Sequence, residues 1–181
     1  MKIKMLLILF SMSTITCHAG VIDGTGECNL NNGILAKITS TQDSDGNTRF
    51  KLAIDNAVIN MFPDGPTHGF PAPPDIVLNK CIDGALVYVI NYGPPYQVGF
   101  LVTGSHNTKG TQTIYFSEKE LPTLLYRGKN DIKLIIPNSG NEVPNKFIVY
   151  HSNIISGQDE QSGGSDALPD QKSYTITKIT P

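Results

Sequence analysis

The stretch Leu86-Val87-Tyr88-Val89-Ile90 is apolar at every position and rich in β-branched residues. A strand with one face in water alternates apolar and polar residues, whereas a short continuous apolar run between turn formers is typical of a strand buried on both faces. Turn formers stand on both sides, Asp83-Gly84 before the run and Gly93-Pro94-Pro95 after it. We therefore predict a central β-strand over 86–90, followed by a returning strand over 98–102.

Outward from this strand, alternation with a period of two marks further strands. It is clearest over 49–55, where Phe50, Leu52 and Ile54 fall on one face and charged residues on the other. The turn formers of 43–47 predict a hairpin between this strand and the one before it. Similar patterns predict strands over 34–39, 76–78, 111–116, 132–136, 146–155 and 174–179.

The composition agrees with a fold of many short elements. The chain has 181 residues and contains 17 Gly and 12 Pro, more turn formers than a long-helix protein tolerates. This length favours a single domain. Eight to ten short strands predict an all-β fold. We expect an antiparallel β-sandwich over residues 20–155, with a β-barrel as the alternative.

Two segments depart from the strand pattern. Ser117 followed by Glu120 resembles the capping box of a helix, and Pro122 limits the predicted short helix to one or two turns ending by Tyr126. Residues 156–172 are dominated by Gly, Ser, Gln and Asp, which predicts a flexible acidic segment. A C-terminal strand is expected within 173–181.

Residues 1–19 have the layout of a secretory signal peptide. Two lysines precede an apolar run over 5–10, and Cys17-His18-Ala19 places small residues before a cleavage point. We expect a mature chain that begins at Gly20, and a bacterial protein that is periplasmic or secreted. The alternatives are a short N-terminal anchor, a buried strand, or a lipoprotein acylated at Cys17.

Cys28 and Cys81 are the cysteines that remain after export. Two cysteines in an oxidising compartment most simply form one disulfide. This bridge closes a loop of 53 residues, for which chain entropy predicts about 4 kcal/mol of stabilisation. The alternative is two unpaired thiols, because the close cysteine pairs of a redox motif or a zinc ribbon are missing.

The charge balance excludes some classes of partner. The chain has a net charge of −2, and removal of Lys2 and Lys4 lowers its basic residues from 14 to 12 against 16 acidic ones. Since no basic field is left to hold phosphates, we expect no nucleic-acid partner. No later apolar run is long enough to span a membrane, so we expect no transmembrane segment in the mature chain.

The candidate metal ligands are not spaced as metal sites are. His68, His106 and His151 stand at none of the short spacings that zinc sites use. The sequence Asp43-x-Asp45-x-Asn47 begins like a calcium loop, but its glycine and its twelfth residue do not match that pattern. We interpret it as a turn, and we expect no metal and no cofactor.

Catalytic patterns are equally weak. The chain has no G-x-S-x-G elbow, and the neighbours Ser105 and His106 do not make a triad. Glu118 and Glu120 could be proposed as glycosidase carboxylates, but two acids at a predicted helix start are better explained by the positive end of that helix. We therefore expect no catalytic residue and no enzyme.

Aromatic residues on stiff loops favour binding. Residues 63–75 contain five prolines and carry His68 and Phe70, while Tyr92 and Tyr96 flank a Pro-Pro tip. A ring on a rigid loop loses little entropy when it docks. We predict that these four residues contribute to a binding surface. The alternative is that their rings pack back on the sandwich and support their own loops.

These observations predict an exported, non-catalytic binding protein. Its partner is expected to be another protein or a surface glycan. Two roles fit, an adhesive surface subunit or an inhibitory, immunity-type protein that blocks an enzyme. The alternative is a secreted hydrolase or a metal-dependent enzyme with its site on the loops of the sandwich.

Overall fold

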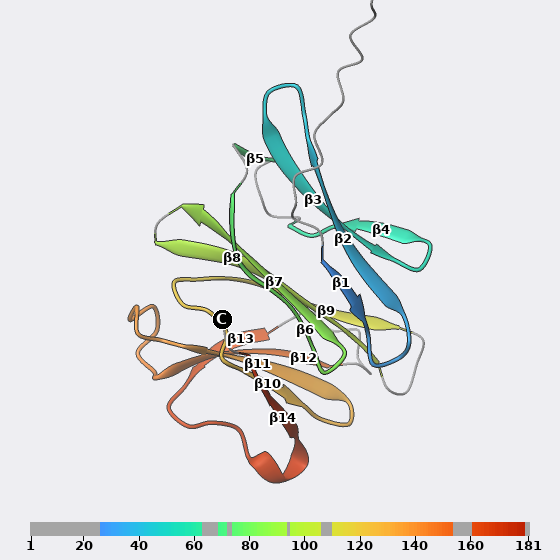
Figure 1. Ribbon diagram of the computed structural model, residues 1–181. Helices are drawn as coiled ribbons and strands as arrows, with labels where there is room; N and C mark the ends of the chain where they lie inside the picture. The colour runs from blue at the N-terminus through green and yellow to red at the C-terminus, as the bar shows by residue number, and fades with distance from the viewer. Residues whose placement is uncertain are drawn as a thin grey trace, which may run out of the picture.

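A computed structural model describes residues 26–62, 69–71, 74–93, 95–105, 110–153 and 161–179. Within these residues the chain forms three antiparallel sheets that lie in layers and do not close into a barrel (Figure 1). The all-β sandwich that the sequence predicts is thereby confirmed. None of the described helices is long and apolar enough to cross a membrane.

The N-terminal sheet contains the first five strands. Their order is β1 (Glu27–Asn29), β2 (Leu35–Gln42), β3 (Asn47–Ile54) and β4 (Ala57–Asn60), and β5 (Phe70–Pro71) pairs with the start of β3. The predicted hairpin joins β2 to β3. In its turn, the Asp43 carboxylate accepts hydrogen bonds from the backbone N–H groups of Asp45 and Asn47 at 3.0 and 2.9 Å.

The other two sheets follow in the sequence. The middle sheet has the order β6 (Asp75–Ile82), β7 (Ala85–Gly93), β8 (Tyr96–Gly104) and β9 (Thr111–Glu118). The C-terminal sheet has the order β13 (Gln161–Ser165), β12 (Phe147–Asn153), β11 (Asp131–Pro137), β10 (Leu124–Arg127) and β14 (Thr175–Lys178).

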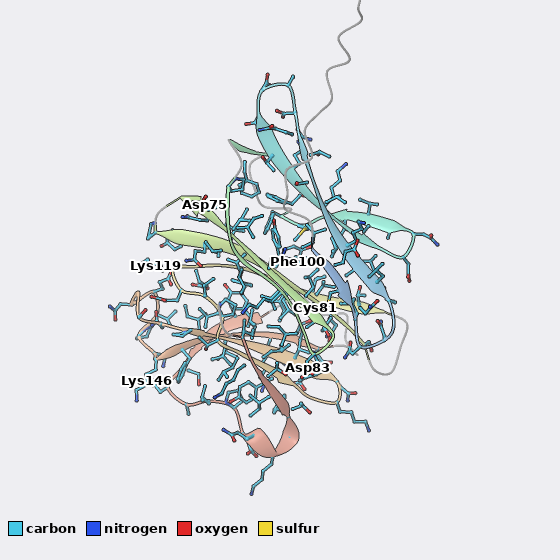
Figure 2. All side chains as sticks on the ribbon, in the orientation of Figure 1. Asp75, Cys81, Asp83, Phe100, Lys119 and Lys146 are labelled. Carbon is cyan, nitrogen blue, oxygen red and sulfur yellow. A yellow bond between two sulfur atoms is a disulfide. The ribbon has the colours of Figure 1, made fainter. Side chains whose placement is uncertain are left out.

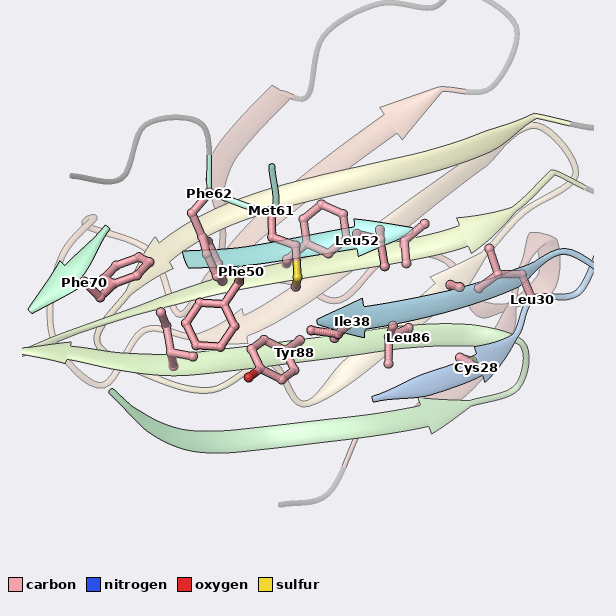
Figure 3. Close-up of a cluster of buried hydrophobic side chains, with 14 residues drawn as sticks. Cys28, Leu30, Ile38, Phe50, Leu52, Met61, Phe62, Phe70, Leu86 and Tyr88 are labelled. Atoms are coloured by element: carbon pink, nitrogen blue, oxygen red, sulfur yellow. The ribbon is translucent and has the colours of Figure 1, made fainter. Parts of the chain in front are cut away.

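The middle sheet is buried on both faces, as the apolar run of β7 predicts. Leu86, Tyr88 and Ile90 point to one side and pack with the N-terminal sheet in the first core (Figure 3). Val87 and Val89 point to the other side and pack with the C-terminal sheet in the second core. All five side chains are at most 1% exposed. The molecule therefore has two cores that share one sheet.

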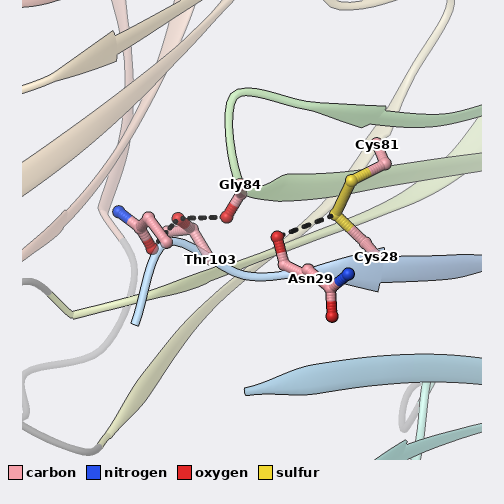
Figure 4. The surroundings of a disulfide bond; sticks show 6 residues. Cys28, Asn29, Cys81, Gly84 and Thr103 are labelled. Carbon is pink, nitrogen blue, oxygen red and sulfur yellow. Dashed lines mark hydrogen bonds between the residues drawn. A yellow bond between two sulfur atoms is a disulfide. The ribbon is translucent and has the colours of Figure 1, made fainter. Parts of the chain in front are cut away.

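A disulfide joins the first two layers. Cys28 of β1 is bonded to Cys81 of β6, with 5.2 Å between their Cα atoms (Figure 4). The predicted bridge is thus confirmed. Next to it, the carbonyl of Gly84 accepts hydrogen bonds from the Asn31 N–H and the Thr103 hydroxyl, both at 3.2 Å. Covalent and polar contacts therefore fasten the N-terminal sheet to one end of the middle sheet.

The tight turn between β6 and β7 explains the need for glycine there. Asp83 and Gly84 both have positive φ, 54° and 68°, as a two-residue type I′ hairpin requires. A Cβ atom on Gly84 would also come within 2.6 Å of the Asn31 nitrogen. The close approach of the N-terminal segment to this turn therefore depends on a residue without a side chain.

The expected short helix at Ser117 is wrong. Ser117 and Glu118 continue strand β9, where they pair with Val98 and Gln97 of β8. Further along, residues 124–127 form β10 between β11 and β14. The capping pattern is a local signal, and the ladder with β8 outweighs it because tertiary pairing overrides local helix propensity.

Regular structure also occurs where a flexible segment was expected. Residues 154–160 lie outside the described part of the chain. Beyond them, β13 pairs with β12 from Gln161 to Ser165, and a single 3-10 turn, η1, spans Gln171–Ser173. The predicted C-terminal strand is present as β14. Pairing with β12 gives order to a Gly- and Ser-rich sequence that has little strand propensity of its own.

Removal of the disulfide should destabilise the chain without unfolding its individual sheets. We expect Cys28→Ala/Cys81→Ala to lower the free energy of unfolding by about 2–4 kcal/mol, because the unfolded chain regains the entropy of an open loop. Urea denaturation of both proteins measures this. A double variant as stable as the wild type would contradict the clamping role of the bridge.

Candidate functional site

Phe70, one of the four predicted binding residues, lies in the first core. Its ring is only 3% exposed and packs against Phe50 and Phe62, with ring centroids 6.1 and 5.5 Å apart (Figure 3). Phe70 pairs with Thr48 in the ladder between β5 and β3, and this pairing turns the ring inward. The ring is therefore part of the first core.

The other predicted binding residues have different positions. His68 lies outside the described residues. The backbone of Tyr92 belongs to β7, but its side chain is not among the described parts of the structure. Tyr96 begins β8 and is 43% exposed. The Lys119 ammonium group lies 5.7 Å from the centre of its ring, within the range of a cation–π contact. Of the two residues whose side chains are described, Tyr96 lies on the surface and Phe70 does not.

The buried carboxyl group of Glu118 lies next to Lys119, which Figure 2 labels. Glu118 is 8% exposed and accepts a hydrogen bond from the Tyr150 hydroxyl at 2.5 Å. Burial raises the pKa of Glu118, and the neighbouring Glu142 carboxyl raises it further by charge repulsion and a hydrogen bond. A charged Glu118 carboxyl is therefore disfavoured both by its burial and by its acidic neighbour.

The residues around Glu118 link two separate parts of the chain. The Glu142 carboxylate also accepts the backbone N–H of Lys119 at 3.2 Å, and the Lys119 ammonium donates to the Gly140 carbonyl at 3.2 Å. These bonds tie the end of β9 to the loop between β11 and β12. Because Glu118 is buried, a substrate has little access to its carboxyl group.

Metal ligands do not gather in the described residues. Across the described ranges, no group of three or more His, Cys, Asp or Glu side chains could hold an ion. The carboxylate of Asp43, from the calcium-like sequence, accepts the backbone N–H groups of its own turn, and the bond from Asn47 contributes most to lowering its pKa. Of the three candidate histidines, His68 and His106 lie outside the described residues, whereas His151 lies in β12.

The outer face of the C-terminal sheet is crossed by a segment of the chain. Strands β13 and β14 lie at opposite edges of this sheet, so the chain between them, residues 166–174, passes across it (Figure 1). We call these residues the crossing segment. Asp166 anchors its start by accepting hydrogen bonds from the Asn145 side chain and the Lys146 N–H at 3.0 and 3.2 Å.

A groove of about 540 Å³ lies beside the crossing segment. Strands β11, β12 and β13 form its floor, and the crossing segment forms its wall. This volume is within the range of small-molecule and peptide sites. It is lined by Lys133, Val149, His151, Ser162, Gly163, Gly164, Ser165, Ala167, Leu168 and Pro169.

The floor of the groove is basic and polar, and its wall is apolar. Among the described lining residues, Lys133 and His151 are the basic ones, and the acids Asp131 and Asp166 adjoin the lining. The His151 Nε2 atom lies 3.2 Å from the Asp131 carboxylate, which also accepts the Tyr174 hydroxyl at 2.7 Å. The ammonium of Lys133 lies 4.9 Å from the centre of the Tyr174 ring. Tyr174 of the crossing segment thus helps to fix both polar groups of the floor.

This arrangement gives the hydrolase alternative no added support. A serine hydrolase needs a serine hydroxyl hydrogen-bonded to the histidine of a His–Asp pair. Within the described chain, His151 bonds to Asp131, whereas the Ser165 hydroxyl donates to the carbonyl of Ala167 at 2.6 Å. Ser162 pairs with Tyr150 in the ladder and shares the inward face of that residue.

A second, more polar hollow of about 410 Å³ lies at the far end of the crossing segment. Lys129 and Lys172 are among its lining residues. Arg127 also lines it, but the Nε and Nη2 atoms of that side chain are buried. Burial lowers the pKa of Arg127, and the charge of Asp83 opposes this effect. Among the described residues, these two donors have no hydrogen-bond partner.

One strand of the groove floor could be predicted from the sequence, but the wall could not. The alternation over 146–155 predicts that Phe147, Val149 and His151 share one side of their strand, and the structure confirms this. The wall and the outermost floor strand come from Gly- and Ser-rich sequence, which has no pattern that predicts a site. His151 therefore could be placed on an exposed face, but not in a groove.

Comparison with known proteins identifies no relative. No protein-family model matches the chain, and no curated protein or solved structure is significantly similar to it. A function must therefore be inferred from the geometry of the chain itself.

Truncation of Phe70 should destabilise the protein much more than truncation of Tyr96. We expect Phe70→Ala to lower the free energy of unfolding by about 3–5 kcal/mol, because a buried ring is lost and a cavity is left. We expect Tyr96→Ala, at an exposed ring, to change it by less than about 1 kcal/mol. Thermal or urea unfolding of both variants measures the difference, and equal losses would contradict these positions.

Glu118 should make stability depend on pH. Its folded-state pKa is raised above the ordinary value of 4.5, so its stabilising contribution is full below that pH and is lost as pH rises through the folded-state pKa. Glu118→Gln mimics the protonated carboxyl and should remove this loss. Urea denaturation between pH 4 and about 9 tests both proteins.

Tyr150→Phe provides a second test of the same cluster. It removes the hydrogen bond that favours the charged form of Glu118, so the pKa should rise further and the loss of stability should extend to higher pH. Identical pH profiles for the wild type and Glu118→Gln would contradict the assignment of the raised pKa to Glu118.

Proposed function

We propose that this chain is an exported bacterial binding protein, periplasmic or secreted, that performs no catalysis. The groove on the outer face of the C-terminal sheet is the observation that carries the proposal. It combines a basic and polar floor with an apolar wall, and its one His–Asp pair bonds to a tyrosine rather than to a nucleophile.

The disulfide supports the exported location. A bridge between two layers persists in an oxidising compartment and is rare in the cytosol. The signal-peptide pattern of residues 1–19 points in the same direction. Cleavage near Gly20 is therefore part of the proposal, and the intact mass of the protein recovered from the periplasm or medium tests it.

Of the two proposed partners, a protein fits the groove better than a glycan. The CH-rich face of a sugar ring packs well on an aromatic ring, and the described residues that line the groove include no aromatic one. An adhesive surface subunit and an enzyme inhibitor both need a protein-binding surface of this kind. Tyr96 and Lys119 at the end of the middle sheet add a second exposed contact for either role.

Capture of partners by the wild type and by a groove variant tests the proposal. The immobilised mature protein is exposed to the surface and secreted fractions of a bacterial culture, and the retained proteins are identified by mass spectrometry. The groove variant Lys133→Glu/Leu168→Asp reverses the charge of the floor and places an acid on the wall. We expect it to retain at least about tenfold less of the partner than the wild type does, as loss of a central contact predicts.

A matched control separates the groove from a general effect of added acid. Lys51→Glu/Val58→Asp makes the same kinds of change on exposed residues of the N-terminal sheet and should retain the partner. The partner should also leave the wild type with its mass unchanged. Equal capture by both variants would contradict the groove as the site, and a cleaved or modified partner would contradict a non-catalytic role.

A further inference from the structure

Strand β9 is the longest edge strand without a protecting feature in the described sheets. Within the described residues it pairs with β8 alone, in an unbroken register from Thr111 to Glu118. Up to Ser117 its sequence, Thr-Gln-Thr-Ile-Tyr-Phe-Ser, contains no charge and no proline. Edge strands that must avoid pairing with another chain are usually short or carry a charge, a proline or a bulge. The edge of β9 is therefore a template for a further strand.

The remaining edges of the described sheets do have such features. At the opposite edge of the middle sheet, β6 carries Asp75 and Lys80, and its register with β7 shifts between Ile76 and Leu78. At the edges of the two outer sheets, β1, β4, β5, β13 and β14 have only two to five residues each. Short strands offer few backbone groups to a partner.

The C-terminal sheet extends one strand beyond β9. Strand β9 lies opposite β12, because the rings of Phe116 and Tyr150 are 6.0 Å apart. At the other side of the middle sheet, the Asp83 carboxylate in the turn between β6 and β7 accepts the hydroxyl of Thr177 in β14 at 2.6 Å. The four strands of the middle sheet thus span the C-terminal sheet from β12 to β14, and β13 lies beyond them.

The exposure of β13 agrees with this offset. Ser162 pairs with Tyr150 and shares its inward face, but Ser162 is exposed whereas Tyr150 is buried. Gly164 is exposed on the same face, although the Asn145 side chain lies where its Cβ atom would be. Neighbouring strands lie about 4.8 Å apart and packed sheets about 10 Å apart. A strand added to β9 would therefore lie over Ser162, as β9 lies over Tyr150.

We propose that an extended segment of a partner protein adds to the edge of β9 and fills the space over the inward face of β13. Its backbone bonds to β9, in the mode of β-strand addition. The side chains that it turns toward the C-terminal sheet lie beside Ile114 and Phe116 of the second core, so apolar residues fit at these alternate positions. Its other side chains lie beside Thr113 and Ser117, which suit polar residues.

The offset of the sheets favours a single strand over a second copy of the chain. Antiparallel pairing of β9 with the β9 of a second copy would place both C-terminal sheets on the same side of the joined middle sheets, because the two-fold axis is perpendicular to them. The β13 of each copy would then lie over the other copy's β9, where that copy's β12 already lies. A lone extended segment brings no second sheet and avoids this collision.

A synthetic strand tests the inference. The probe is a terminally blocked heptapeptide of alternating Thr and Val, and the control is the same peptide with methylated backbone nitrogens, which cannot donate to a ladder. We expect the probe to shift the backbone NMR signals of residues 111–118 and to slow the exchange of their amide protons. It should bind at least about tenfold more tightly than the control, the effect of one or more backbone hydrogen bonds.

A variant of β13 tests the position of the added strand. Ser162→Trp places a large ring in the space over β13 and should weaken binding of the probe by at least about tenfold, as loss of a central contact predicts. Because Ser162 is exposed and tryptophan suits a strand, the thermal midpoint should stay close to that of the wild type. Thr41→Trp makes a similar change at an exposed strand position of the N-terminal sheet and should alter neither property.

Several results would overturn the inference. Equal binding of the probe and its methylated control would do so, as would undiminished binding by Ser162→Trp. NMR shifts confined to residues 147–151 of the groove floor, or no shift in residues 111–118 at any soluble concentration of the probe, would also contradict it. Self-association that Ser162→Trp weakens in analytical ultracentrifugation would show that a second copy occupies the edge instead. The groove is tested through Lys133 and Leu168, so its proposed function is independent of these outcomes.

Discussion

The two apolar faces of the middle sheet are the constraint on which the rest of the structure depends. Strand β7 places Leu86 and Tyr88 on one face and Val87 and Val89 on the other, and all are fully buried. Burial of each such side chain contributes about 1.5–3 kcal/mol, so a fold that left either face in water would lose much of its stability. Both faces must therefore be covered, and the two outer sheets cover them.

Much of this arrangement could be predicted from the sequence, because local patterns determine it. The apolar run of β7, the alternation of β3 and β12 and the pairing of Cys28 with Cys81 are all correct. A local pattern shows that a face of a strand is buried, but not which sheet packs against it. The number of layers was therefore not predictable. The helix expected at Ser117 failed for the same reason, since a tyrosine 32 residues away, Tyr150, helps to fix Glu118 in a strand.

The candidate site was less predictable than the fold because it depends on where the chain crosses a sheet. The inner face of the C-terminal sheet is used by the second core, and its outer face remains for other contacts. Strands β13 and β14 occupy opposite edges of this sheet, and the crossing segment between them builds the groove wall. Small residues without periodicity form much of this region. For Phe70 the sequence suggested a binding role, because the residue follows a proline-rich loop, but its ring lies in the first core.

Native-state hydrogen exchange tests the central claim, that two cores share one middle sheet in a single cooperative unit. Amides of β7 and β8 should exchange most slowly, with an opening free energy equal to that of global unfolding measured with denaturant. Amides at the edges, as in β13, should open at lower free energy. If β7 amides instead exchange through a low-energy opening while either outer sheet stays protected, the middle sheet is not the shared core and the account is contradicted.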